Sequence, residues 1–178
     1  MRVIAGRYKG RRLHAPSWSG LRPTSDRLKE TLFNVLGDRV VGARVLDGFA
    51  GSGALGIEAL SRGSRAVTFI DTDIRALGLV EAILGRCGIA DGYVMICGSF
   101  VETVCRLPAD QLFEVILLDP PYEQSDLDDV LAAATAYLAP LGIRIRVPLD
   151  RAERHPQRER RVRVRRLALD GELRRGDL

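Results

Sequence analysis

One stretch of the chain decides the fold, and it runs Val45-Leu46-Asp47-Gly48-Phe49-Ala50-Gly51-Ser52-Gly53-Ala54-Leu55-Gly56. An apolar strand predicted over 44–47 is followed by glycines where the chain must turn into a helix, predicted over 53–61. Because glycine lacks a Cβ atom, this turn can approach a ligand closely. Gly51, Gly53 and Gly56 match the nucleotide-binding spacing G-x-G-x-x-G, although a tight turn without any ligand would also explain them.

The alternation of helix and strand continues on both sides of this loop. A helix that Thr24 or Ser25 can cap is expected to end near Gly37, and further helices are predicted over 73–87 and 125–138. Apolar strands are predicted over 66–70, 93–96, 114–118 and 143–147. Strands that are apolar on both faces indicate a mainly parallel sheet. We therefore predict a doubly wound, Rossmann-like α/β fold with helices on both faces of the sheet.

Two carboxylates near the glycine loop indicate the kind of cofactor. Asp47 ends the first strand, where a carboxylate would attract a cationic ammonium group and repel a pyrophosphate. This favours S-adenosylmethionine over a nicotinamide or flavin dinucleotide. Asp71 ends the second strand about 20 residues after Gly51, where an acid can grip the ribose of either cofactor. Asp73 is predicted to cap the next helix.

A second motif, Asp119-Pro120-Pro121-Tyr122, follows the apolar residues 115–118. It lies just past the carboxyl end of a predicted strand, which is where open α/β sheets bind ligands. Asp119 and the Pro120 carbonyl can accept the two N–H bonds of an exocyclic base amine, which orients its nitrogen and stabilises the developing positive charge. Tyr122 can stack on the base. The alternative is a rigid strand-to-helix turn.

Length and composition indicate an ordinary globular protein. A chain of 178 residues fits one compact domain, and 46% hydrophobic with 28% charged residues is typical of such domains. The apolar runs are far shorter than the roughly 20 residues needed to span a membrane. The first residues lack the core of a secretory signal, so we expect a cytoplasmic protein without a membrane partner. The three cysteines show no C-x-x-C spacing and are predicted to be buried thiols, outside any disulfide or metal site.

The net charge of +4 is unevenly distributed. Basic residues crowd the first 23 residues, and a second arginine run extends from 144 to 175, whereas the middle is acidic or neutral. Such clusters suit nucleic-acid phosphates, although many are only solvated surfaces. We predict a basic arm over 1–23 in the same domain as residues 24–178, of which 148–178 form an atypical Arg-rich segment.

The chain resembles the bacterial family of small-subunit ribosomal RNA guanine-N2 methyltransferases over about residues 1–140. The matching stretches are Arg2-Val3-Ile4-Ala5-Gly6, Lys9-Gly10-Arg11-Arg12-Leu13, Arg22-Pro23-Thr24-Ser25-Asp26-Arg27, Leu32-Phe33-Asn34, 49–63 and Asp119-Pro120-Pro121-Tyr122. The resemblance implies a seven-stranded class I methyltransferase fold with a short N-terminal β-hairpin arm. It also implies a monomer that methylates the N2 amine of a guanine in 16S ribosomal RNA within the small subunit. The cofactor would be S-adenosylmethionine, converted to S-adenosylhomocysteine, without a metal.

The resemblance also implies roles for individual residues. The implied catalytic residues are Asp119, Pro120, Pro121 and Tyr122. The predicted cofactor-binding residues are Asp47, Phe49, Ala50, Gly51, Gly53, Asp71, Thr72, Ser99 and Phe100. The predicted RNA-binding residues are Arg7, Lys9, Arg11, Arg12, Arg22 and Arg27, the last of which is equally compatible with a helix-surface charge.

Three departures from the family pattern stand out. Gly48 replaces a larger apolar residue, and Ser99-Phe100 follows Gly98 where the family has an acid that accepts from the adenine amine. Ser99 or a backbone group is predicted to take over that role. After Pro140 we expect an edge strand over 143–147 and another within 162–169, but the sequence does not identify both closing strands of the family pattern. The hypothesis is that the tail has diverged or that its reading frame is altered.

Several alternative functions remain open from the sequence. The same Asp-Pro-Pro-Tyr chemistry would serve an adenine or cytosine amine in DNA or RNA, although no separate domain for DNA recognition is expected. A catalytically weak RNA-binding factor in ribosome assembly is compatible with the basic tail. A dinucleotide-dependent oxidoreductase is favoured only by the glycine spacing.

Overall fold

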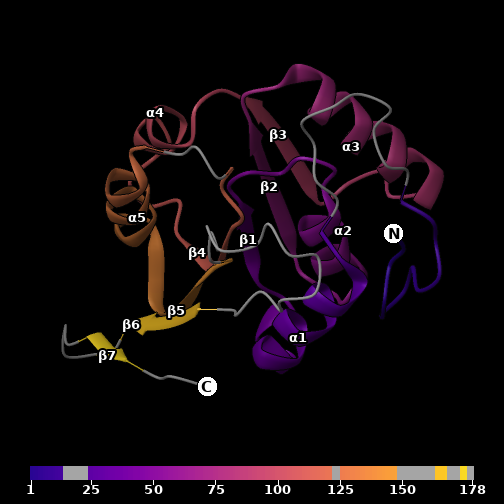
Figure 1. Cartoon of the computed structure of the whole chain (residues 1–178), viewed down its shortest axis with the longest axis horizontal. Coiled ribbons are helices and arrows are strands. Elements are labelled where there is room, and N and C mark those ends of the chain that lie inside the picture. The colour runs from indigo at the N-terminus through magenta and orange to yellow at the C-terminus, as the bar shows by residue number, and fades with distance from the viewer. Residues whose placement is uncertain (14–23, 122–124, 148–162, 168–172, 176–178) are drawn as a thin grey trace, which may run out of the picture.

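The structure is a computed structural model of the whole chain, and it describes residues 1–13, 24–121, 125–147, 163–167 and 173–175 (Figure 1). Its elements are α1 (Asp26–Leu36), the 3₁₀ helix η1 (Gly37–Val40), β1 (Arg44–Asp47), α2 (Ala54–Ser61), β2 (Ala66–Asp71), α3 (Ile74–Cys87), β3 (Tyr93–Cys97), α4 (Phe100–Cys105), β4 (Phe113–Leu118), α5 (Leu127–Ala136), β5 (Leu138–Arg146), β6 (Arg163–Leu167) and β7 (Leu173–Arg175). No helix among these described residues combines the length and the apolar character needed to cross a membrane.

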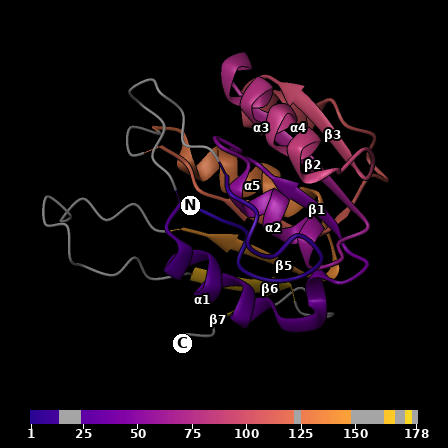
Figure 2. The same cartoon turned by 90° about the vertical axis from the view of Figure 1, so that its right-hand side faces the viewer.

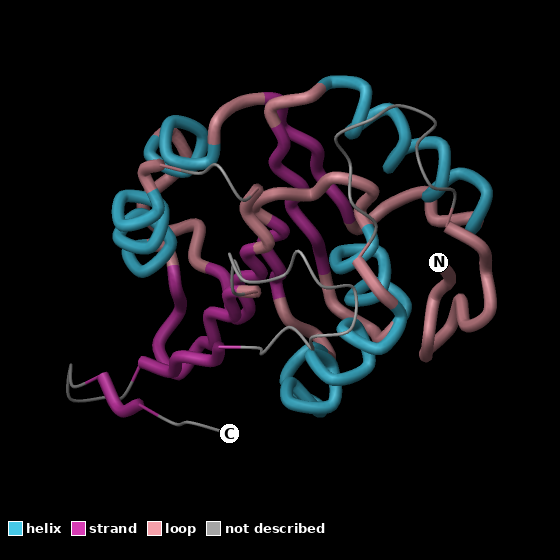
Figure 3. The backbone as a smooth tube through the Cα atoms, in the orientation of Figure 1, coloured by secondary structure: helices cyan, strands magenta, loops and turns pink. Residues whose placement is uncertain are grey.

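Seven strands form one sheet in the order β3-β2-β1-β4-β5-β6-β7. The first five strands of that order are parallel, and β6 and β7 continue the sheet as antiparallel strands. Helices α1 to α3 cover one face and α4 with α5 cover the other (Figures 1 and 3). The predicted doubly wound fold is therefore confirmed.

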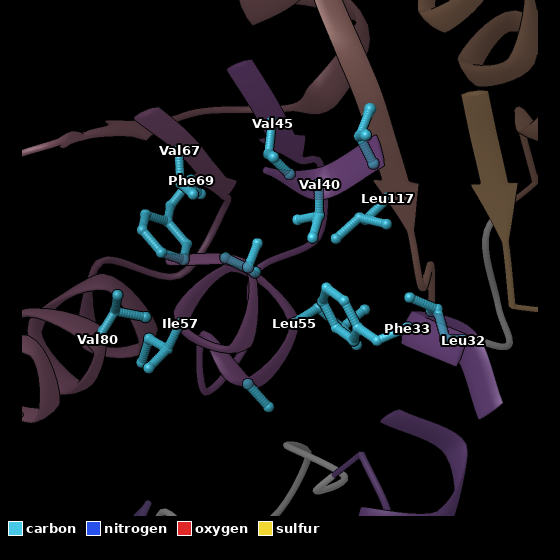
Figure 4. Close-up of a cluster of buried hydrophobic side chains, with 14 of the residues drawn as sticks. Leu32, Phe33, Val40, Val45, Leu55, Ile57, Val67, Phe69, Val80 and Leu117 are labelled. Atoms are coloured by element: carbon cyan, nitrogen blue, oxygen red, sulfur yellow. The ribbon is translucent and has the colours of Figure 1, made fainter. Parts of the chain in front are cut away.

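The larger hydrophobic core lies between the sheet and helices α1 to α3 (Figure 4). Its centre is formed by completely or almost completely buried side chains: Leu32, Phe33, Val45, Ile57, Val67, Phe69, Val80 and Leu117. The second core lies under α4 and α5. Because strands β1 and β4 contribute side chains to both cores, they are apolar on both faces, as their sequences predicted.

The helix ends follow local capping chemistry. The Ser25 hydroxyl accepts a hydrogen bond from the Leu28 amide at 3.2 Å, and Gly37 closes α1 with a φ of 53°. Asp73 accepts from the Arg75 amide at 2.9 Å, which confirms its predicted role as a helix cap. Ser25, rather than Thr24, is therefore the N-cap of α1.

Strand β5 lies inside the sheet, so the prediction of an edge strand over 143–147 was wrong. It pairs with β4 on one side and with β6 on the other. The alternating sequence fits this interior place because Ile143 and Ile145 face the larger core. Arg144 is buried on the opposite face, where its Nη1 donates to the Leu131 carbonyl of α5 at 2.9 Å.

The two closing strands bear on the expectations for the tail. Strand β6 confirms the strand predicted within 162–169. Strand β7 was not predicted, because three residues are too few to show an alternating pattern. The other residues of 148–178 lie outside the described part of the chain, so the altered-tail hypothesis stays a hypothesis.

The cysteines do not all behave as predicted. Cys87 is buried, but Cys97 and Cys105 are exposed, and all three thiols are free. Cys97 ends the edge strand β3, and Cys105 ends the short helix α4, so neither is covered on all sides.

The N-terminal arm is a minimal hairpin over residues 1–13. Arg2 and Arg12 form an antiparallel bridge, and the Val3 and Gly10 amides complete its backbone pairing. Val3 and Leu13 are buried in the same core as α1 to α3. The predicted hairpin is confirmed, and residues 14–23 lie outside the described part.

Gly56 allows α2 to pack closely on the sheet. A Cβ atom at this residue would lie 2.2 Å from Cε1 of Phe69 and 2.9 Å from Cγ1 of Val67. Gly56 has an ordinary α-helical conformation, so its backbone angles do not require glycine. Glycine is required here by the close packing of the helix on the strand.

We expect Gly56→Ala to destabilise the protein by about 1–3 kcal/mol through overpacking, although alanine is the better helix former. Gly78→Ala is the matched control, because a Cβ atom on Gly78 in α3 would meet no atom of another element within 4 Å. That control should stabilise by up to about 1 kcal/mol. Urea unfolding of both variants measures the difference, and equal stabilisation by both would contradict the packing argument.

Candidate active site

Three acidic residues lie at the carboxyl edge of the sheet. Asp47 is opposite Phe69 of β2 and Leu117 of β4 in the strand register. Asp71 and Asp119 each come two residues after those partners, so all three lie past or at the ends of adjacent strands. The predicted cofactor loop and the Asp-Pro-Pro segment are thereby brought to one edge of the sheet.

Asp47 is almost fully buried, with 1% of its surface exposed. Its Oδ2 accepts a hydrogen bond from the Gly56 amide at 2.9 Å, whereas Oδ1 has no partner among the described residues. Burial raises the pKa of the Asp47 carboxyl to about 7; the Gly56 hydrogen bond opposes this, and the charges of Asp119 and Asp71 add to it. A cation beside Oδ1 would restore the charged form.

Asp71 holds the glycine loop in place. Its Oδ2 accepts from the Gly51 amide at 2.7 Å, and its Oδ1 accepts from the Asp73 amide at 2.9 Å. Gly51 and Gly53 have φ angles of 52° and 71°, which other residues adopt only with strain. Each Asp71 oxygen has capacity for a second hydrogen bond, so the carboxylate can also receive a ligand hydroxyl.

Asp119 has a partner that sequence reasoning missed. The Thr24 hydroxyl donates to Asp119 Oδ2 at 3.5 Å, across 95 residues of sequence. Thr24 is buried just before α1, and the sequence indicated only a capping role for it. Pro120 is buried and Pro121 is exposed, whereas Tyr122 lies outside the described residues.

The remaining loop residues predicted to bind cofactor flank this edge. The Ala50 amide donates to the Ile70 carbonyl at 2.9 Å, and Thr72 is exposed just after β2. Ser99 precedes α4, and its side chain makes no capping hydrogen bond. The Gly98 amide donates to the Asp71 carbonyl at 3.0 Å, which draws the Ser99 segment against the end of β2.

Gly48 and Phe100, which follow β1 and begin α4, respectively, are packed closely against each other. The Phe100 ring stacks on Phe49 with ring centroids 5.6 Å apart and an interplanar angle of 18°. A Cβ atom on Gly48 would lie 2.5 Å from Cε2 of Phe100. Gly48 therefore makes room for Phe100, whose ring is buried in the second core. A direct contact of Phe100 with cofactor stays a prediction.

Five of the six predicted RNA-binding residues lie in the described part of the chain, and all five are exposed. Arg7, Lys9, Arg11 and Arg12 are exposed on the arm, and Arg27 is exposed on α1. Arg11 also donates through Nη1 to the Arg86 carbonyl of α3 at 2.8 Å. Arg22 lies outside the described residues.

A buried carboxylate holds the arm, and sequence reasoning missed it. Glu58 of α2 is fully buried, and its two oxygens accept from the Ile4 amide at 2.7 Å and the Ala5 amide at 3.0 Å. Arg62 pairs with Glu58 through Nε at 2.8 Å. The signal was available, because a single charge in an otherwise apolar helix indicates a buried charge that needs partners.

Lys29 is a buried charge of the same kind. It is fully buried on the apolar face of α1, donates to the Arg2 carbonyl, and lies 3.3 Å from Asp26. Burial lowers the pKa of the Lys29 ammonium, and the nearby Asp26 and Glu58 charges oppose that shift. The described residues include no group of three or more side chains suited to hold a metal ion.

Comparisons with known proteins agree with this geometry. The family described as Conserved hypothetical protein 95 matches residues 1–151. The Bacillus subtilis protein named putative rRNA methyltransferase YlbH is 40% identical over 139 residues, which are 77% of this chain and 75% of that protein. Ribosomal RNA small subunit methyltransferase D of Haemophilus influenzae is 40% identical over 123 residues, covering 68% of this chain and 64% of that protein. The chain thus spans just under two thirds of that relative.

A solved structure is similar over nearly the whole chain. A hypothetical protein of Thermus thermophilus matches with a TM-score of 0.73 and 29% identity, over 90% of this chain and 92% of that one. With the sheet order, the structural matches confirm the predicted Rossmann-like class I methyltransferase fold. The chain therefore belongs to the family described as Conserved hypothetical protein 95, and its relatives include proteins named ribosomal RNA small subunit methyltransferase D.

Proposed function

We propose that this protein transfers a methyl group from S-adenosylmethionine to the exocyclic N2 amine of a guanine in 16S ribosomal RNA. The observation that carries the proposal is the convergence of Asp47, Asp71 and Asp119 at one edge of the sheet, beside the glycine loop. Relatives named ribosomal RNA small subunit methyltransferase D support the substrate class.

The residues at this edge fit S-adenosylmethionine. The unpartnered Oδ1 of Asp47 suits its ammonium group, and Asp71 suits its ribose hydroxyls. When bound, the cofactor supplies an electrophilic methyl carbon. Three nearby carboxylates would repel the pyrophosphate of a dinucleotide, so the oxidoreductase alternative is disfavoured.

The chemical task of the protein is to present the amine. The lone pair of a base amine is delocalised into the ring, so the amine attacks poorly until it is oriented. Asp119 and the Pro120 carbonyl accept its two N–H bonds and stabilise the positive charge that develops on the nitrogen. The Thr24 hydroxyl restrains Oδ2 of Asp119. Tyr122 is proposed to stack on the guanine.

The predicted RNA-binding residues Arg7, Lys9, Arg11, Arg12, Arg22 and Arg27 are proposed to contact the RNA backbone. The proposed substrate is the RNA within the small ribosomal subunit, and the protein is proposed to act as a cytoplasmic monomer without a metal. The proposed methyltransferase unit is 24–178, with the arm as part of the same domain.

We expect Asp119→Asn to lower methyl transfer by about 10²–10³-fold, because the amide loses the charge that orients and stabilises the amine. Tritiated-methyl transfer to small subunits from a strain lacking the modification measures turnover, and calorimetry with S-adenosylhomocysteine checks that cofactor binding is retained. Asp128→Asn, at an exposed site in α5, is the control. Unchanged turnover would show that Asp119 does not act in the site. If the unmodified protein bound NAD but neither S-adenosylmethionine nor S-adenosylhomocysteine, the cofactor assignment would be overturned.

Cofactor affinity should rise with pH between about pH 5.5 and 7. The pKa of the Asp47 carboxyl is raised to about 7, so the group is mostly protonated below that pH in the free protein. An adjacent ammonium favours the ionised form, so binding releases a proton there, and affinity gains at most tenfold per pH unit. Calorimetry in two buffers of different ionisation enthalpy counts the protons released.

Asp47→Asn should abolish this proton release and weaken binding at pH 7.5. Asp110→Asn removes an exposed carboxyl elsewhere and should keep the pH dependence of the unmodified protein. A pH-independent affinity in the unmodified protein would show that Asp47 does not hold the ammonium group.

A further inference from the structure

The arm is fixed to the body of the protein on one side. Besides the Glu58 clamp, Ser61 donates through Oγ to the Ala5 carbonyl at 2.5 Å and accepts from the Tyr8 amide at 3.0 Å. Lys29 donates to the Arg2 carbonyl from within the core. Figures 1 and 2 both show the indigo arm lying against α2. The backbone of the arm is thus preorganised, while the side chains of Arg2 and Arg12 are exposed among the described residues.

Two arginines stand opposite each other in this fixed hairpin. Arg2 and Arg12 are direct partners in the antiparallel bridge, so their side chains project from the same face. Like charges directly opposite each other in such a pair are destabilising. The docked arm therefore presents two positively charged side chains on one face.

Only part of this positive charge is neutralised. Asp26 lies 3.6 Å from Nε of Arg2, but the same carboxylate lies 3.3 Å from the Lys29 ammonium. Within the part of the chain that the structure describes, Arg12 forms no ion pair. The Arg2 side chain is 68% exposed, so its interaction with Asp26 is weak and easily exchanged.

The two arginines line a cavity. Its volume is about 380 Å³, and it is lined by Met1, Arg2, Arg12, Leu13 and Asp26. The cavity is wide open to solvent, so it can admit a charged group that belongs to a larger molecule. With two guanidinium groups and one shared carboxylate, the cavity suits a singly charged anion with an attached organic group.

The cavity lies close to the reaction centre. Asp26, in its wall, is two residues after Thr24, whose hydroxyl contacts Asp119 at 3.5 Å. Consecutive Cα atoms are about 3.8 Å apart, so only a short stretch of chain separates the cavity wall from the catalytic carboxylate. A strand of RNA that presents a base to Asp119 can therefore also reach the cavity.

We propose that this cavity binds a phosphodiester group of the RNA substrate, with Arg2 and Arg12 as its two cationic ligands. The inference rests on the proposed function and extends it to a residue, Arg2, with no role assigned so far. Planar guanidinium groups match phosphate oxygens in charge and geometry. Phosphate binding also relieves the repulsion between the two arginines.

The test measures binding of unmodified small subunits to Arg2→Gln, Arg12→Gln and the double variant between 50 and 300 mM salt. Each single change should weaken binding about tenfold at low salt, the scale of one lost charge-assisted hydrogen bond. Each should also make the slope of log K against log salt shallower by about one. Arg106→Gln, an exposed arginine at the end of α4 on the opposite face, should change neither quantity.

Two further measurements separate a phosphate site from a purely structural role. Affinity for S-adenosylhomocysteine should be unchanged in every variant. If an arginine variant lost both this affinity and RNA binding, Arg2 and Arg12 would be needed for folding, and the proposal would be overturned. Asp26→Asn removes the competing carboxylate and should strengthen RNA binding. Weaker binding by this variant with intact cofactor affinity would mean that the Arg2–Asp26 pair only holds the arm.

The failure of this inference is distinguishable from the failure of the proposed function. If the unmodified protein transfers methyl groups to the subunits while the Arg2 and Arg12 variants keep its salt slope, the phosphate site alone is refuted. If it transfers no methyl group, the proposed function fails, but the binding slopes still test the phosphate site.

Discussion

Parallel pairing of β1 with β2 and β4 is the constraint on which the site depends. The register sets Asp47 opposite Phe69 and Leu117, so the chain leaves all three strands at the same level. Three carboxylates then share one edge, and their mutual repulsion together with burial keeps Asp47 from ionising readily. A cation beside Asp47 would favour the ionised form of this carboxyl. The same pairing that stabilises the sheet thus creates the acidic edge at which the ammonium group of the proposed cofactor would bind.

Buried charges join the arm to this sheet. Glu58 and Lys29 are fully buried, and a buried charge without partners would cost several kcal/mol. Main-chain groups of the arm form hydrogen bonds with both charges. The Ile4 and Ala5 amides donate to Glu58, and the Arg2 carbonyl accepts from Lys29. The docked arm therefore supplies part of the hydrogen bonding that both buried charges need, beside Arg62 and Asp26.

Close packing explains two glycines that local sequence preferences disfavour. Gly48 offers no side chain to the end of β1, yet the Phe100 ring occupies the space that a larger side chain would need. Gly56 lies within a helix, yet only hydrogen fits between its Cα and Phe69. In both cases an aromatic ring from another element requires the glycine. The glycine loop proposed to hold the cofactor is thus shaped by the two cores beneath it as much as by its own conformation.

The sequence by itself determined the alternation of strands and helices, the glycine loop, and the acids at the strand ends, because periodicity, capping and turn chemistry are local. Tertiary structure alone decided the Thr24–Asp119 contact, the clamp on the arm and the interior place of β5. Each of these depends on segments that are far apart along the chain; Thr24 and Asp119 are separated by 95 residues. No local pattern records which distant backbone amide will meet a buried carboxylate, since only the packing of α1 and α2 against the sheet brings those groups together.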